Sequence, residues 1–471
     1  MPHLLPNFTP AHIGIQGPPP NMKGASDFRS QVNGLGDCSL FSLLLSYLPG
    51  PAFVPRAAKP LAVLAAALLI YGVQPAAPVA AQELENVTVK GRPKPDYDAL
   101  GIRLRSFQFF PKIELDETYD TNVFAKATDP KDDFITLITP SLAVKSDFSP
   151  HALNFGADAK IGRYATNSTE DYEDLSAYID GRLDVRHALK LTAGMTVDAG
   201  HEMRGEESEA GGKEPGHSLK YSAKGGLSYK LSKFGLDLDS TLTDTNYDDV
   251  TANNGTIINN DDRDIVDYLT TLRASVDINP EYSAFTEFEY KVVDYWDSID
   301  DGGANRDSTG TRVSLGAEFD ITEIIDGEAS AGYFWQKYDD PQFKDVSGYA
   351  LGFDLTWNVT PLTTITGGVV REIKETTSSD VSGITSSKLE FGVDHELMRN
   401  IILSVNGSYT YDTYNGSSEV NTTISAGAAV RYLFSERYYA ELNVNKTHKD
   451  NNIGTGDYGV LKTILKLGVQ F

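Results

Sequence analysis

Apolar and polar residues alternate with a period of two along most of the chain after residue 106. In the last segment, Leu461, Leu465 and Phe471 fall on one face, and Lys462 and Lys466 fall on the other. This period is typical of a β-strand with one apolar face and one polar face. Similar segments recur at 152–161, 175–186, 219–231, 312–321, 349–359 and 388–396. A shift of one residue would exchange the faces, so the pattern also specifies the strand register.

Short turns and longer polar loops alternate between these segments. The short turns are expected near 149–150, 187–188, 232–233, 279–280, 322–327, 360–361, 398–400 and 435–436. The longer loops are expected near 121–132, 167–171, 204–216, 249–262, 298–307, 338–343, 376–384, 412–418 and 448–457. Outer-membrane barrels have short periplasmic turns and long outer loops. The pattern therefore predicts an all-β fold, a transmembrane antiparallel up-and-down β-barrel of about 18 strands, with roughly 16 to 20 possible.

The length of the segments separates a membrane barrel from stacked soluble sheets. They run over about 12 to 17 residues, whereas soluble strands are typically about 5 or 6 residues long. A tilted strand that crosses a bilayer has to span roughly 25–30 Å. Aromatic residues also gather near the segment ends, as at Tyr282 and Trp357 beside turns and at Tyr119 and Tyr247 towards loops. Such girdles favour a membrane barrel.

An export signal precedes the barrel region, although it lies well inside the chain. Arg56 and Lys59 are followed by an apolar stretch over 61–72 and by small residues that end at Ala81. This order predicts signal-peptide cleavage near Ala81 and location in the bacterial outer membrane. The single cysteine, Cys38, lies in the removed part, so the mature chain could form no disulfide.

Three regions are expected along the chain. They are a leader or signal segment over 1–81, a periplasmic N-terminal extension over 82–105, and the barrel over 106–471. Either the translation start lies downstream of Met1 or the leader is genuinely long. Residues 83–92 resemble the energy-coupling box of siderophore receptors, but the extension is too short for their plug domain. The alternatives are an extended leader stiffened by prolines, or a segment that tucks into the barrel mouth.

The chain is acidic, with 41 Lys+Arg against 66 Asp+Glu and a formal net charge of −25. Such a charge disfavours nucleic acid as a partner. It suits divalent cations, or anionic glycolipid bridged by them. The candidate ligands for weak divalent-cation binding are Asp248, Asp249, Asp261 and Asp262. The alternative is that these are solvated turn residues, and no other cofactor is expected.

The polar faces of the segments carry charges that would point into the lumen. There they avoid lipid, where a Lys or Arg at mid-membrane costs about 2–4 kcal/mol. The predicted lumen-facing residues are Asp158, Lys160, Asp180, Arg182, Asp184, Arg186, Lys220, Lys224 and Lys230, with further charges at Arg273, Glu287, Glu289, Lys291, Arg312 and Glu318. The basic residues over 182–230 would guide an anionic solute or polymer. Alternatively, the charges form a hydrated ladder that only stiffens the wall.

The start of the barrel region resembles a known family. The residues that carry the resemblance are 95–103, 106–107, Pro111, 119–124, 140–142 and 149–153. They are similar to the opening strands of the Putative beta-barrel porin 2 family of bacterial outer-membrane proteins. The resemblance is recognisable over about 95–190 and extends further by architecture. It implies an outer-membrane barrel of a Gram-negative bacterium and, through some relatives, a role in exopolysaccharide export.

The expected function is that of a passive porin-like channel or conduit. Catalytic patterns such as Gly-x-Ser-x-Gly and His-Glu-x-x-His are absent from the sequence, and the adjacent Asp394 and His395 would face opposite sides of a strand. An enzyme is therefore not expected, and exopolysaccharide export is one candidate role for the channel. The alternative is a plugged structural or adhesive surface barrel whose outer loops bind ions or partners.

The last strand is expected to carry the assembly signal. Phe471 ends the chain, and Val469 and Leu467 share its face. An apolar face that closes on an aromatic residue is typical of the final strand of an outer-membrane barrel. The expected partners are therefore outer-membrane lipid and the barrel-assembly machinery, besides an anionic solute or polysaccharide.

Overall fold

The computed structural model describes residues 88–206, 209–322, 324–376, 378, 381–454 and 456–471. The predicted leader, with Cys38 and the cleavage site at Ala81, lies outside the described residues. Among the described residues, no helix has the length and apolar character that crossing a membrane would require.

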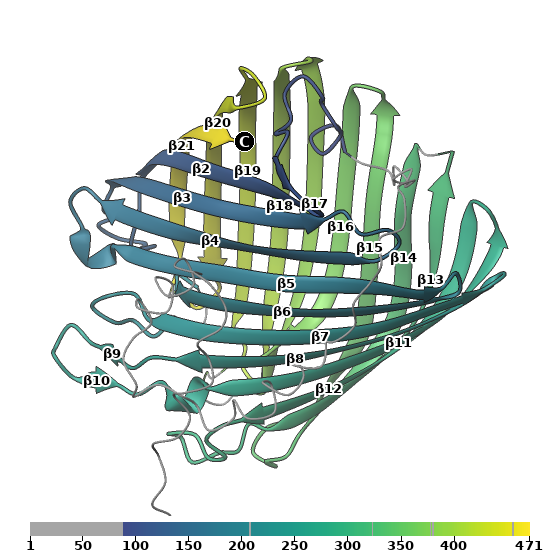
Figure 1. Ribbon diagram of the computed structural model, residues 1–471. Helices are drawn as coiled ribbons and strands as arrows, with labels where there is room; N and C mark the ends of the chain where they lie inside the picture. Colours follow the sequence, from purple (N-terminus) through teal and green to yellow (C-terminus); the bar gives the residue numbers. More distant parts are fainter. Residues whose placement is uncertain (1–87, 207–208, 323, 377, 379–380, 455) are drawn as a thin grey trace, which may run out of the picture. The chain divides into compact units, whose positions relative to one another are not determined.

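The fold is a 19-stranded antiparallel sheet in which one short strand, β1, accompanies eighteen long strands (Figure 1). The long strands are β2 (Phe107–Asp120), β3 (Asp133–Ser146), β4 (Ala152–Tyr164), β5 (Tyr172–Arg186), β6 (Leu189–His201), β7 (His217–Leu231), β8 (Phe234–Tyr247), β11 (Ile265–Asn279), β12 (Tyr282–Tyr295), β13 (Ser308–Ile321), β14 (Ile325–Tyr338), β15 (Val346–Thr360), β16 (Thr363–Lys374), β17 (Gly383–Met398), β18 (Ile401–Asn415), β19 (Val420–Leu433), β20 (Tyr438–Asn451) and β21 (Tyr458–Gln470).

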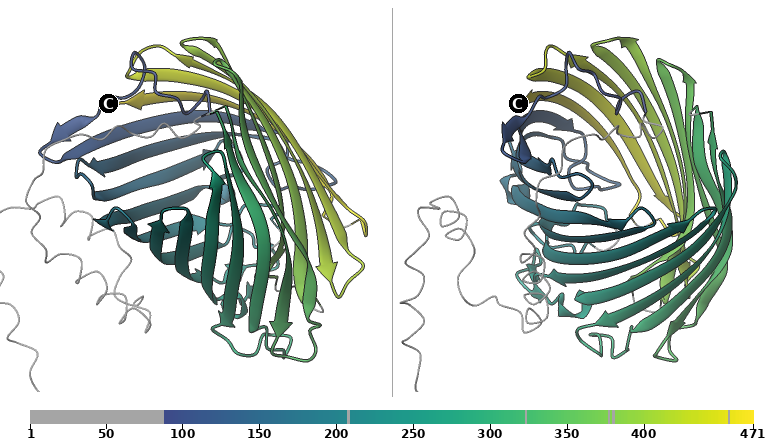
Figure 2. Two further views of the ribbon diagram at one scale, coloured as in Figure 1. Left: turned by 90° about the vertical axis from the view of Figure 1, so that its right-hand side faces the viewer. Right: turned by 45° about the vertical axis from the view of Figure 1, so that its right-hand side comes forward.

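The long strands form a closed barrel. Each strand pairs with its neighbours in the chain, and β8 pairs with β11 across a long loop (Figure 2). The last strand pairs with the first, from Lys112 opposite Gln470 to Asp120 opposite Lys462. Closure removes the free sheet edges that lipid could not satisfy. The predicted fold class and strand number are therefore confirmed.

The connections mostly alternate between short turns and longer loops, as the sequence predicts. The exception is the connection over 416–419 between β18 and β19, where a longer loop was expected but which is as short as the turn over 434–437 that follows β19. The sequence pattern did not predict the shortest elements, which are too short to show a period. These are β1 (Ile102–Leu104), which pairs with the start of β2, the ribbon of β9 (Val250–Thr251) and β10 (Ile257–Ile258), and the 3-10 turns η3 (Ser168–Glu170) and η4 (Asp261–Arg263).

The two faces of the sheet differ in polarity. On β5, Leu175, Ile179 and Leu183 are exposed on one face. On the other face, the Arg273 guanidinium of β11 lies 2.8 Å from Glu328 of β14. Side chains from strands that are this far apart can meet only on the concave side of a curved sheet. The polar face therefore lines the lumen, and the apolar face meets lipid.

Candidate functional site in the barrel lumen

The nine residues predicted to face the lumen occupy alternate positions on neighbouring strands. Asp158 and Lys160 lie on β4, Asp180, Arg182, Asp184 and Arg186 lie on β5, and Lys220, Lys224 and Lys230 lie on β7. The register places Asn154 opposite Asp180, and their side chains are hydrogen-bonded at 3.0 Å. We call the lumenal face of β4–β8 the β4–β8 wall.

Several basic side chains of the β4–β8 wall extend into the lumen without an acidic partner. Lys160, Lys220 and Lys224 are exposed, and the ion pairs found among the described residues include none of them. Lys224 crosses the bare backbone of Gly194, where an added Cβ would come within 2.7 Å of Lys224 Cε. By contrast, Lys230 pairs with Asp277 at 3.0 Å. Water therefore reaches these amines inside a closed barrel.

The lumenal face of β11–β14, here the β11–β14 wall, holds its charges in a network around Arg273. The Arg273 guanidinium contacts Glu287 at 3.0 Å, Glu318 at 2.7 Å and Glu328 at 2.8 Å. It also lies 3.9 Å from the centre of the Phe285 ring. Bidentate and charge-assisted contacts of this kind hold a guanidinium in one place. Arg273 is therefore part of the wall rather than a free cation.

Two more cations of the β11–β14 wall are held in the same way. Arg312 contacts Glu287 at 3.2 Å and also pairs with Glu289. Lys291 lies 3.3 Å from Asp267 and 3.1 Å from Glu375. The lumenal position of Lys291 and Arg312 could be predicted from the alternation, but their partners could not, because those depend on which strands are neighbours.

At the end of the barrel that carries the short turns, which we expect to face the periplasm, residues 88–99 lie against lumenal side chains; we call them the periplasmic strap. The Val89 N–H donates to Thr364 Oγ1 at 2.9 Å on β16. Tyr97 packs against a buried cluster of Ile402, Leu433 and Tyr439 from β18, β19 and β20. The strap therefore runs along the barrel mouth from β21 to β16. This arrangement corresponds to the alternative in which the N-terminal extension tucks into the mouth.

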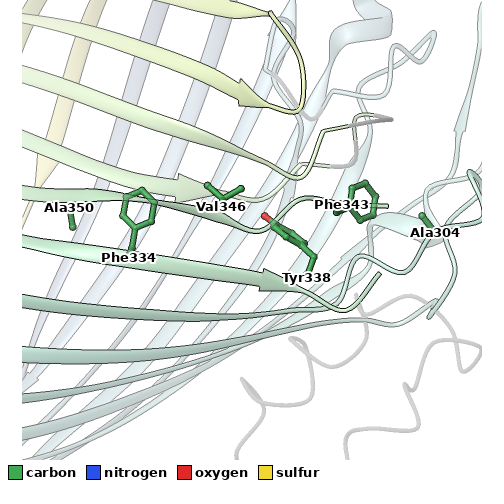
Figure 3. Packing of buried hydrophobic residues seen from close by; sticks show 6 residues of the cluster. All are labelled: Ala304, Phe334, Tyr338, Phe343, Val346 and Ala350. Atoms are coloured by element: carbon green, nitrogen blue, oxygen red, sulfur yellow. The ribbon is translucent and has the colours of Figure 1, made fainter. Parts of the chain in front are cut away.

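At the opposite end, which carries the long loops and which we expect to face outwards, three loops contact one another; we call them the outer cap. A cluster of buried apolar residues joins two of these loops, those after β12 and β14, to β14 and β15; its members are Ala304, Phe334, Tyr338, Phe343, Val346 and Ala350 (Figure 3). Arg306 pairs with Asp300 at 2.7 Å and donates to the carbonyls of Thr376 and Ser378 at 3.0 and 3.2 Å. The loops after β12, β14 and β16 are therefore tied together.

Two further arginines form ion pairs that order the loops next to the β4–β8 wall. Arg204 pairs with Glu170 at 2.7 Å and Glu209 at 2.6 Å. The buried Arg263 pairs with the buried Glu202 and lies 4.0 Å from the centre of the Tyr247 ring. Glu and Arg in loops do not reveal such pairing in the sequence, so these contacts were not predicted.

The acidic residues proposed as cation ligands lie in the loop between β8 and β11, close to η4. They are Asp248, Asp249, Asp261 and Asp262. Asn260 joins the two ends of this loop, because its N–H donates to Asp249 Oδ1 at 3.0 Å and its side chain to the Asp248 carbonyl at 2.8 Å. Burial raises the pKa of neighbouring Asp264 to about 6. Within the described ranges, no group of three or more His, Cys, Asp or Glu has the geometry of a metal site, so cation binding stays a prediction.

The predicted assembly residues lie at the seam of the barrel. Leu467 and Val469 belong to β21, whose other edge pairs with β20. The Phe471 N–H donates to the Pro111 carbonyl at 3.2 Å, and the Arg437 guanidinium lies 5.9 Å from the centre of its ring. Leu467 and Phe471 remain exposed on the lipid-facing side. Their recognition by an assembly machinery stays a prediction.

Comparison with known proteins gives one family and several solved barrels. The model of the Putative beta-barrel porin 2 family matches residues 94–471. No curated protein matches the chain. Among solved structures, OpdL of Pseudomonas aeruginosa is similar at 10% identity and a TM-score of 0.40, over 78% of this chain and 99% of that chain. OccAB4 of Acinetobacter baumannii is similar at 13% identity and a TM-score of 0.41, over 81% and 100%.

The family match extends from the periplasmic strap to the last residue and includes every long strand. It agrees with the resemblance in the opening strands and with the closed antiparallel barrel. The chain therefore belongs to the Putative beta-barrel porin 2 family and is a porin-like β-barrel of the outer membrane.

Proposed function

We propose that this barrel is a passive channel through the outer membrane rather than an enzyme. A closed barrel of about 18 strands has room for an aqueous lumen. The single observation that carries the proposal is the exposure of Lys160, Lys220 and Lys224 on the lumenal face. Charged amines inside a barrel remain exposed only where water fills the space beside them.

The same amines would favour anionic groups on a solute. A basic wall raises the local concentration of anions, and the effect extends over a Debye length of about 8 Å at physiological ionic strength. Asp158, Asp180 and Asp184 share the wall and weaken this preference. We therefore expect a modest anion preference rather than a strict filter.

An anionic polymer such as an exopolysaccharide is one solute that this arrangement would suit. Lys220 and Lys224 lie on the same face of β7, so they would meet successive charges of an extended chain. The resemblance of the opening strands to the family supports this role only through relatives associated with export. Small anions would use the same residues, so transport of polymer needs its own assay.

A plugged structural or adhesive barrel is the second candidate function. The periplasmic strap and the outer cap support it, because they place folded chain at both ends of the barrel. In that case the exposed amines would be hydrated but would lie on no continuous path.

Single-channel recording of the purified barrel in planar bilayers separates the two functions. A passive channel predicts stepwise, ohmic currents at neutral pH. The matched control is the same preparation after heat unfolding, which should add no current. Barrels that insert but conduct no current would refute the channel and support the plugged alternative.

A further inference from the structure

We propose that the periplasmic strap is a detachable gate that narrows the periplasmic mouth and swings out about Gly101. The inference rests on the proposed channel function, because a gate requires a conducting lumen. It concerns residues 88–99 and the lumenal ends of the strands that they touch.

The far end of the strap is held by a few polar contacts. Val89 and Thr364 are almost completely buried, with 0% and 1% of their surfaces exposed, and a single hydrogen bond joins them. Arg92 donates to Asn358 Oδ1 at 2.7 Å and to the carbonyl of Pro361. Isolated contacts of this kind can break together at low cost, unlike a strand ladder.

The middle of the strap crosses the barrel seam. Tyr97 packs on the cluster formed by Ile402, Leu433 and Tyr439. Its carbonyl accepts a hydrogen bond from Gln470 Nε2 at 3.2 Å. The strap therefore covers the lumenal ends of the last strands, where it takes up part of the opening.

The sequence of the strap prevents it from joining the sheet. Pro93 and Pro95 have no N–H to donate to a ladder, and the strap contains turns but no strand. At its base, β1 is fixed to β2 by pairing from Ile102 opposite Phe109 to Leu104 opposite Phe107. The strap is therefore an irregular arm on a fixed base.

Lys94 lowers the cost of releasing the strap. Its Nζ donates to the carbonyls of Val89 at 2.7 Å and Arg92 at 3.3 Å, both within the strap. The ion pairs found in the described part of the chain do not include Lys94, and burial lowers its pKa. A buried ammonium without a carboxylate in contact regains hydration when it leaves, which offsets the contacts that are lost.

Gly101 provides a point about which the arm can turn. Its φ of +70° is in the left-handed region, where glycine carries no steric cost. An added Cβ would lie 2.8 Å from Gln108 Cγ and Phe110 Cε1. A side chain there would strain the base of the strap in its docked position.

The first test measures detachment by thiol labelling, without reference to current. Val89→Cys and Lys90→Cys are matched variants, because Val89 is buried and the neighbouring Lys90 is exposed. Both are made with Cys38→Ser, so that no other cysteine remains. Transient opening predicts that maleimide labels Val89→Cys at least about tenfold more slowly than Lys90→Cys. Adding Arg92→Ala should speed the labelling of Val89→Cys several-fold and leave Lys90→Cys unchanged. Equal rates at the two positions, or no effect of Arg92→Ala, would overturn the proposal.

The second test measures the gate itself. The pair Val89→Cys and Thr364→Cys joins the two groups that are in contact, and each single variant is the control. In bilayers, the oxidised pair should show one low conductance level, and reductant should restore switching to a higher level. Equal conductance of the oxidised and reduced forms would overturn the gate but not the channel. No current in any form would instead refute the proposed channel, and the gate with it.

Discussion

The β4–β8 wall and the β11–β14 wall of the lumen use the same residue types but treat charge differently. On the β11–β14 wall, Arg273 contacts carboxylates from β12, β13 and β14. On the β4–β8 wall, Lys220 and Lys224 are exposed, and no ion pair found in the described part of the chain includes them. The β11–β14 wall holds its cations in fixed positions. On the β4–β8 wall, Arg182 pairs with Asp184 at 3.3 Å and Lys230 pairs with Asp277 at 3.0 Å, but Lys220 and Lys224 are exposed to the contents of the lumen.

The register between strands accounts for this difference. Arg273 lies directly opposite Glu287, and Glu318 lies directly opposite Glu328. Lys224 instead lies opposite Gly194 on one side and Thr241 on the other. Alternation along a strand determines which face a residue takes, but only the neighbouring strands decide whether a charge finds a partner. The comparison therefore predicts different outcomes for similar substitutions.

The largest effect is expected from Arg273→Ala. The substitution leaves Glu287, Glu318 and Glu328 without their shared cation. A fully buried pair costs about 3–5 kcal/mol when one partner is removed. The Arg273 side chain is 22% exposed, so we expect a loss of about 2 kcal/mol in the free energy of unfolding, measured by urea titration in lipid vesicles.

Lys230→Ala is the matched control on the β4–β8 wall. Lys230 has Asp277 as its ion-pair partner, and its side chain is 62% exposed. Exposed pairs contribute about 0–1 kcal/mol, so this loss should be the smaller one. Equal losses for the two variants would show that the walls do not differ in how they use their charges.

A smaller effect is expected from Glu328→Gln, which removes one carboxylate from the lumen but leaves Arg273 two others. The free energy of unfolding should fall by about 1 kcal/mol, because charge-assisted hydrogen bonds are lost. The reversal potential under a salt gradient should move towards anion preference. Glu173→Gln, on the opposite face of β5, removes the same charge outside the lumen. A shift of equal size in that control would argue against a lumenal effect.

The smallest effect is expected from adding to the β4–β8 wall a cross-strand ion pair like those of the β11–β14 wall. Thr241 lies opposite Lys224, so Thr241→Glu should form a cross-strand ion pair and stabilise the barrel by about 0.2–1 kcal/mol. The control Thr241→Gln introduces a side chain of nearly the same size without the charge, so it should stabilise the barrel less than Thr241→Glu does. If both variants have the same free energy of unfolding, the strand register alone does not explain why Lys224 has no ion-pair partner among the described residues.

Much of the barrel could be predicted from the sequence, because the membrane imposes a strict pattern on each strand. On β5, Leu175, Ile179 and Leu183 alternate with Asp180 and Arg182, and no other register keeps the charges away from lipid. Long polar loops and short turns follow the same constraint. The number of strands, their connectivity and the face on which the charges of each strand lie could therefore be predicted from the sequence.

The contacts within the lumen could not be predicted in the same way. Arg273 meets Glu328 only because three strand pairings bring them together across 55 positions of sequence. Arg306 and the loops of the outer cap have no period to reveal their packing. The position of the strap in the barrel mouth is only one of the alternatives that the sequence leaves open, because its prolines exclude a strand but do not determine where the segment lies.

The central claim is that exposed lysines of the β4–β8 wall set the ion preference of an open lumen. The most direct test is the reversal potential of the purified barrel in a bilayer under a salt gradient, for the wild type, Lys224→Glu and Arg163→Glu. Arg163 alternates with the lumenal residues of β4 and so lies on its outer face, where the same charge change serves as the control. The account predicts that the wild type conducts, that Lys224→Glu shifts the potential towards cation preference, and that Arg163→Glu leaves it nearly unchanged. Identical potentials for all three proteins would contradict it.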